Sequence, residues 1–125
     1  MIRIIFSIYV FIHGLAHVVG FVVPWRLMEL EDAPYKTTIF RNIIDVGDAG
    51  IRIIGIIWLL TAFAFFYSGI TIILDLSYWK FLTIVITMFS LVLCVLGLPD
   101  SKIGILANIL ILGFVLMNEK FGWLI

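Results

Sequence analysis

The chain has 125 residues, of which 64% are hydrophobic and only 13% are charged. A soluble domain of this length needs more polar surface, so the composition is typical of an integral membrane protein in contact with a lipid bilayer. Eight basic and eight acidic residues give a formal net charge of zero, which excludes the basic face that a nucleic-acid partner requires.

Four apolar segments approach the length of about 20 residues that a helix needs to cross a hydrocarbon core of about 30 Å. They cover residues 3–23, 50–68, 79–98 and 102–118. The second can continue to Leu74, because only Gly69 interrupts its apolar run. The sequence therefore predicts an all-α transmembrane four-helix bundle that forms one integral membrane domain over residues 1–125.

The connections between these segments differ in length. The turn Leu98-Pro99-Asp100-Ser101 is tight, so the last two helices should form an antiparallel hairpin with Asp100 or Ser101 capping the second of them. The first connection is long, and its residues 37–46 place four apolar side chains on one helical side. This pattern predicts a short interfacial helix between spans 1 and 2.

Aromatic side chains indicate where the spans end, and basic residues indicate how the spans are oriented in the membrane. The residues that flank the predicted spans, where rings favour the headgroup region, are Trp25, Tyr67, Tyr78, Trp79 and Trp123. The first and third connections share one side and carry Arg26, Lys36, Arg41, Arg52 and Lys102, whereas the other side carries Arg3, Lys80 and Lys120. This excess predicts a cell-membrane protein with the long connection in the cytoplasm and both termini outside.

The first span contains the only two histidines, His13 and His17. At about 100° per residue they share one helical face with Tyr9, Ala16 and Gly20, while large branched side chains occupy the opposite face. Polar groups inside a membrane usually face the interior of a bundle. We therefore expect the histidine face to point inward.

Each remaining span has its own stripe of small or polar residues, which is typical of the inner face of a membrane bundle. These residues are Asp48, Gly55, Ala62 and Gly69 on the second span, Thr83, Thr87, Ser90, Cys94 and Gly97 on the third, and Gly104, Asn108, Val115 and Asn118 on the fourth. The rise of about 1.5 Å per residue puts His17, Gly55, Ser90 or Cys94, and Asn108 at similar depths. The expected result is a polar pocket whose ligand-binding candidates are His13, His17, Ser90, Cys94 and Asn108. An ion pair between Asp48 and Arg52, four residues apart, should mark its mouth.

The histidine pair is compatible with several chemistries. Two imidazoles at i and i+4 can share a transition metal, with Cys94 or Asn108 completing the shell. The glutamate of a zinc-hydrolase helix is missing, and a haem within one chain is disfavoured because both histidines lie on one helix. Proton relay is another interpretation, and a purely structural role, with both rings hydrogen-bonded to carbonyls, Ser90 or Asn108, is a third.

Three motifs in the spans resemble a group of small, uncharacterised four-span prokaryotic membrane proteins, some of which carry transporter-component labels. The motifs are His13-Gly14-x-x-His17-x-x-Gly20-Phe21, Gly55-x-x-Trp58-x-x-x-Ala62 and Pro99-Asp100-Ser101-Lys102-x-Gly104-x-x-x-Asn108. The resemblance covers most of the chain except the long first connection. The sequence is more distantly similar to DoxX-like four-helix membrane proteins, some of which are associated with quinone-linked oxidation.

The function expected from these patterns is that of a small membrane binding or accessory subunit that uses the histidine face. Alternatives are a small subunit of a membrane oxidoreductase or of a metal- or quinone-handling enzyme, and a transporter component. The sequence contains no catalytic triad or paired-carboxylate pattern, so we do not expect a stand-alone enzyme. A bundle this small should associate as a homo-oligomer or within a larger membrane complex.

Overall fold

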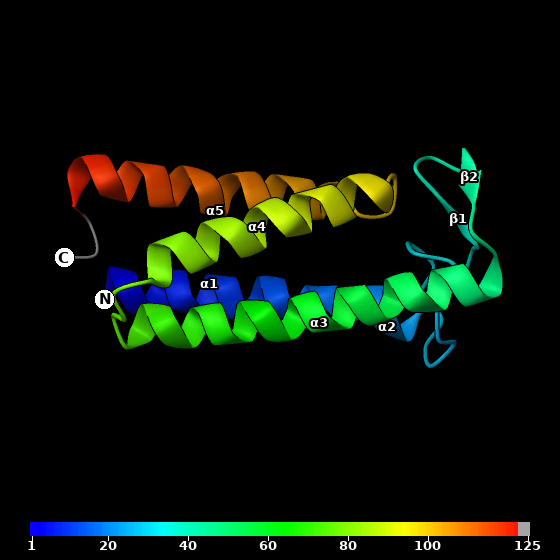
Figure 1. Cartoon of the computed structure of the whole chain (residues 1–125), viewed down its shortest axis with the longest axis horizontal. Coiled ribbons are helices and arrows are strands. Elements are labelled where there is room, and N and C mark those ends of the chain that lie inside the picture. The colour runs from blue at the N-terminus through cyan, green and yellow to red at the C-terminus, as the bar shows by residue number, and fades with distance from the viewer. Residues whose placement is uncertain (123–125) are drawn as a thin grey trace.

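A computed structural model, which describes residues 1–122, shows four long helices in an antiparallel bundle (Figure 1). The elements are α1 (Ile2–His17), α2 (Val19–Val22), β1 (Thr38–Ile39), β2 (Ile44–Asp45), α3 (Gly47–Ile73), α4 (Trp79–Leu96) and α5 (Lys102–Phe121). Four helical segments of the described chain are long and apolar enough to cross a membrane, and α1 with α2 forms the first of them. The predicted all-α four-helix fold is thus confirmed, and the protein is a multi-pass membrane protein. The flanking position predicted for Trp123 lies outside the described residues.

The inner faces of the helices carry the predicted small and polar residues. Ala62, Thr83, Thr87, Ser90 and Asn108 are fully buried, whereas leucine, isoleucine and phenylalanine side chains cover the outside of the bundle. This arrangement is the one expected in lipid, because small residues allow helices to approach and polar residues can bond across the gap.

Gly69 explains why the second span continues beyond Ser68. A Cβ atom at Gly69 would lie 2.7 Å from the Phe11 ring, and the Gly69 carbonyl accepts a hydrogen bond of 2.8 Å from the Ser7 hydroxyl. The glycine therefore permits close contact with α1 instead of ending the helix, and α3 runs on to Ile73.

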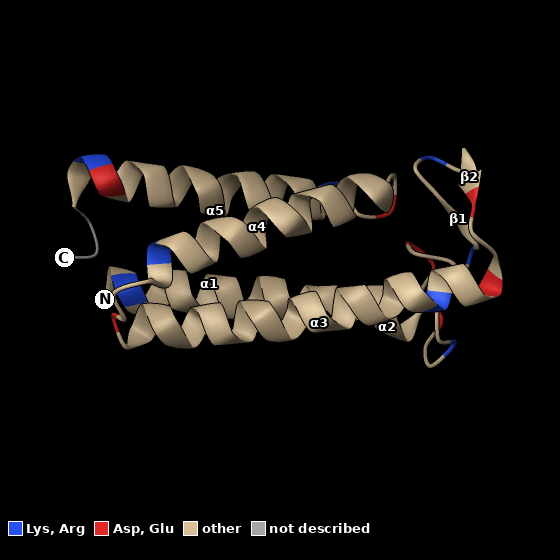
Figure 2. Ribbon diagram, in the orientation of Figure 1, with Lys and Arg blue, Asp and Glu red and all other residues tan. Residues whose placement is uncertain are grey.

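The two halves of the bundle differ in character. An apolar core fills the half that contains the N-terminus, where Phe6 stacks on Phe114 at a centroid distance of 4.2 Å and Trp79 is buried beside them. Charged residues lie near the two ends of the bundle (Figure 2), including the ion pair of Arg3 with Asp75 at 3.2 Å. The polar side chains described below occupy the other half, next to the first and third connections.

The interfacial helix predicted for residues 37–46 is wrong, because this segment forms the antiparallel hairpin β1–β2. Its turn contains three residues with positive φ, Phe40, Arg41 and Asn42, which is incompatible with a continuous right-handed helix. The amides of Phe40 and Arg41 donate to the carbonyls of Leu96 and Leu98 at 2.7 and 3.2 Å. Carbonyls at the end of a helix lack intrahelical partners, so the hairpin supplies hydrogen-bond donors to the carbonyls at the end of α4. We call the first connection from Lys36 to Asp45, which covers this end of the bundle, the roof.

The turn between α4 and α5 forms the predicted antiparallel hairpin, but its caps differ from the prediction. Ser101 occupies the N-cap position of α5 without a side-chain capping bond, since its hydroxyl donates to the Cys94 carbonyl. The Asp100 carboxylate instead forms an ion pair with Lys36 in the first connection, with Oδ2 3.1 Å from the lysine Nζ. Asp100 thus joins the α4–α5 turn to the first connection, whereas Ser101 joins the turn to the end of α4.

Candidate functional site

The two histidines connect α1 to α4 and α5 through one hydrogen-bond network. His13 Nε2 lies 2.7 Å from Asn108 Oδ1, and His17 Nε2 lies 2.6 Å from the Ser90 hydroxyl. The Asn108 amide nitrogen closes the network by donating to Ser90 Oγ at 3.0 Å, with Cys94 Sγ at 3.6 Å. The structure therefore brings together all five residues that the sequence proposed as ligand-binding candidates.

These contacts determine where the protons lie when both rings are neutral. His17 Nδ1 is 2.8 Å from the His13 carbonyl, which can only accept, so Nδ1 carries the His17 proton. His17 Nε2 is then the acceptor and the Ser90 hydroxyl donates to it. Asn108 Oδ1 is an acceptor as well, so His13 carries its proton on Nε2. The two histidines consequently adopt opposite tautomers.

Neutral rings suit this environment. His13 and His17 are 5% and 2% exposed, and no ion pair joins either ring to an acidic side chain of residues 1–122. The Phe65 ring contacts both imidazoles at centroid distances of 4.9 and 5.0 Å. An imidazolium here would lack a counterion in an apolar medium, which is energetically costly.

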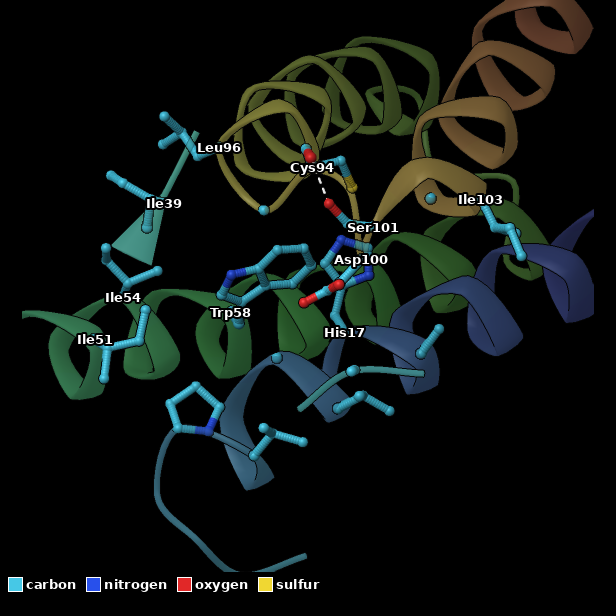
Figure 3. Close-up of a pocket in the computed structure, with 18 of the residues that line it drawn as sticks. His17, Ile39, Ile51, Ile54, Trp58, Cys94, Leu96, Asp100, Ser101 and Ile103 are labelled. Carbon is cyan, nitrogen blue, oxygen red and sulfur yellow. Dashed lines mark hydrogen bonds between the residues drawn. The ribbon is translucent and has the colours of Figure 1, made fainter. Parts of the chain in front are cut away.

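A cavity of about 320 Å³ lies between the histidine face of α1, the start of α5 and the roof (Figure 3). Its walls are mostly apolar. Ala16 of α1 and Ala107 of α5 line the cavity with small side chains, while Gly20 and Gly104 allow Trp58 and Cys94 to approach closely. The volume is at the lower end of the range for small-molecule sites, about 300–1,000 Å³.

The predicted site residues divide into two groups around this cavity. His13, His17 and Cys94 line it, whereas Ser90 and Asn108 lie behind the rings and hold them. No cluster of three metal-ligating side chains occurs among the described residues. Both nitrogens of His17 already have hydrogen bonds, so the geometry adds no support to the metal hypothesis, which stays a prediction.

The ion pair predicted between Asp48 and Arg52 at the mouth of the pocket is wrong. Asp48 pairs with Arg26 at 3.2 Å and accepts a hydrogen bond from Tyr35, while the Arg52 guanidinium lies 5.4 Å from the Trp25 ring centroid. An exposed i,i+4 ion pair is worth only about 0.3–0.5 kcal/mol, so partners from a folded connection can replace it. Neither Asp48 nor Arg52 is among the described residues that line the cavity.

The charged pair at the cavity is Lys36 with Asp100, which the sequence did not indicate as a site. Both side chains line the cavity and are partly buried, with 28% and 24% of their surface exposed. They are 64 residues apart in the chain, and only the docking of the first connection on the α4–α5 turn places them together.

Trp58 is another wall residue that the inward stripes missed. Its ring lies 5.1 Å from that of His17 and against Gly20, where a Cβ atom would approach the indole Cγ to 2.4 Å. The stripe had placed Gly55 at this level, but Gly55 contacts Trp25 and Pro24 instead. A signal was present in the sequence, because a tryptophan in the middle of a span is far from the headgroup region that tryptophans prefer.

Comparisons with protein-family models, with curated proteins and with solved structures find no match to this chain.

Proposed function

We propose that this membrane protein binds a small apolar molecule in the cavity beside His13 and His17. The observation that carries the proposal is the combination of about 320 Å³ of mostly apolar space with two buried histidines in its wall, inside a bundle that spans the membrane. Binding sites of this kind combine apolar walls with a few oriented polar groups.

The position of the cavity favours a ligand that arrives from the bilayer. Ala16, Val19 and Ile103 line the cavity and are also exposed on the outside of α1, α2 and α5. In a membrane these side chains contact lipid, so an apolar molecule can enter between α1 and α5 without crossing water. The ion pair of Lys36 with Asp100 lines the opposite end of the cavity, next to the first and third connections.

The network of Asn108 and Ser90 gives the histidines the hydrogen bonds that a purely structural role requires. That role and ligand binding are compatible, because rings held by a second layer of hydrogen bonds present a fixed surface to a ligand. We place the protein in the cell membrane with the first connection in the cytoplasm, as a subunit of a homo-oligomer or a larger complex. The oxidoreductase-subunit and transporter alternatives stay predictions from the sequence.

Photolabelling with an alkyl diazirine in lipid nanodiscs tests the proposal. We expect labels on the cavity residues Ile51 and Trp58, of which Ile51 is 7% exposed, in addition to labels on lipid-facing residues. Ala107→Phe fills the cavity and should abolish the labels on both residues. Leu106→Phe, at a neighbouring side chain that is 57% exposed, is the matched control and should leave them unchanged. Labels confined to outward-facing residues would refute binding.

A further inference from the structure

One ring nitrogen of the two histidines, Nδ1 of His13, has no hydrogen-bond partner in the network. His13 donates from Nε2 to Asn108, so the other nitrogen of the neutral ring, Nδ1, has a lone pair and no proton. Nδ1 forms no hydrogen bond with the described residues, although His13 is only 5% exposed. No buried side-chain nitrogen or oxygen of residues 1–122 lacks a partner, and His13 lines the cavity. The free lone pair therefore belongs to the surface of the cavity.

The remaining polar groups of the inner cavity wall are already bonded. The Ser101 hydroxyl donates to the Cys94 carbonyl, and both nitrogens of His17 have partners. The inner end of the cavity thus offers a ligand an acceptor at His13 and no free cation. Such a surface favours a neutral ligand with a hydrogen-bond donor, and it disfavours a carboxylate, which could only accept.

Resting on the binding function proposed above, we infer that the ligand is an uncharged apolar molecule with a hydroxyl group that donates to His13 Nδ1. The hydroxyl group lies at the inner end of the cavity, and the apolar part contacts Ala107 and Trp58 in the cavity wall. The ordered network fixes this polarity, because Asn108 Oδ1 keeps the His13 proton on Nε2. A metal ion would find only this one free nitrogen among the histidines.

A pair of probes that differ in one hydroxyl group tests the inference. 4-Hexylphenol and its methyl ether 4-hexylanisole are titrated into the protein in nanodiscs, with the ligand-dependent change in tryptophan emission as the readout, since Trp58 is the tryptophan in the cavity wall among the described residues. One net hydrogen bond should make the phenol bind roughly three- to tenfold more tightly than the ether. In His13→Phe, which keeps an aromatic ring, this preference should disappear. The ratio between the two proteins cancels the different partitioning of the probes into lipid.

Nitrogen NMR of the wild-type protein labelled with ¹⁵N-histidine gives a second readout that does not depend on a variant. We expect His13 and His17 to show opposite tautomers, and only the phenol should shift the resonance of the unprotonated His13 nitrogen. Binding of both probes with the same preference in wild type and His13→Phe, or a His13 proton on Nδ1, would overturn the inference and leave the binding function intact. Binding of neither probe, together with no cavity photolabelling, would overturn both.

Discussion

Asn108→Leu tests whether the network holds the bundle together. Asn108 is fully buried and bonds to His13 of α1 and to Ser90 of α4. Leucine has the same branched arrangement of heavy atoms but no polar atoms, so the change leaves the His13 N–H without its partner in an apolar interior. Ser90 keeps its bond to His17 and is affected less.

Two estimates bound the effect on the free energy of unfolding. A stranded buried donor costs about 1–3 kcal/mol, whereas hydrogen bonds between membrane helices average about 0.6 kcal/mol each because the unfolded chain in a membrane also finds partners. Asn108 makes two such interhelical bonds to nitrogen or oxygen partners, so the second estimate gives about 1.2 kcal/mol. We therefore expect a loss of about 1–2 kcal/mol for Asn108→Leu.

Unfolding in mixed micelles with increasing SDS, followed by circular dichroism, measures this loss. Leu110→Val, at a side chain that is 54% exposed on the same helix, is the control and should change stability by less than about 0.5 kcal/mol. A double-mutant cycle of Asn108→Leu with His13→Leu should give a coupling of about 0.5–1.5 kcal/mol. A variant as stable as wild type, or a coupling near zero, would refute the view that this bond joins α1 to α5.

Three further predictions concern the cavity and its roof. Gly20→Ala should displace the Trp58 indole, change its fluorescence and destabilise the bundle by about 1–3 kcal/mol, because the new Cβ would lie 2.4 Å from the ring. Lys36→Met should accelerate limited proteolysis of the first connection, since it removes the ion pair to Asp100, but should lower stability by no more than about 1 kcal/mol. In the wild-type protein, the β1–β2 hairpin should become easier to cleave by protease as pH falls from 7 through the pKa of Asp45. In Asp45→Asn the hairpin should be less resistant at pH 7, and its resistance should change less on acidification.

The sign of the pH effect expected for Asp45→Asn follows from the hydrogen bonds that the Asp45 carboxylate accepts. The amide of Gly47 and the hydroxyl of Thr37 donate to the Asp45 carboxylate and lower its pKa below the ordinary value. A lowered pKa in the folded state stabilises the hairpin above the unfolded pKa, and this contribution is lost as pH falls through the folded pKa. An unchanged acid profile in Asp45→Asn would contradict this assignment.

For the glycine test, Gly113→Ala is the control, because no atom lies within 4 Å of a Cβ at that position, and it should leave the Trp58 emission unchanged.

The inner faces of the helices could be read from the sequence because one physical rule decides them. In lipid, small and polar side chains turn inward, so helical periodicity alone predicts that His13, His17, Ser90 and Asn108 face one another. The structure confirms their proximity, with each of them hydrogen-bonded to at least one of the others. Depth along straight antiparallel helices is almost additive at about 1.5 Å per residue, which explains why the common level of His17 and Ser90 was predicted, although Trp58 and not Gly55 lies beside His17.

The roof could not be predicted by the same rule. Residues 37–46 have an amphipathic pattern that fits a helix, but the decisive contacts are the backbone bonds of Phe40 and Arg41 to the end of α4. Backbone donors leave no trace in side-chain periodicity. The same docking decides that Lys36 meets Asp100 across the cavity.

The contrast between the two ends of the bundle explains how a chain this small can keep a cavity. The half near the N-terminus is closed by large rings, with Phe6 in contact with both Phe114 and Trp79, and it needs no polar contacts to stay packed. In the other half, Ala16 of α1 and Ala107 of α5 are too small to fill the space between the helices. The His13–Asn108 bond fixes α5 relative to α1, and the docked hairpin fixes the end of α4. The side chains that give the cavity its polar end therefore also join its helices, so Asn108→Leu should lower stability, whereas His13→Phe keeps an aromatic ring in the wall and should still bind both probes.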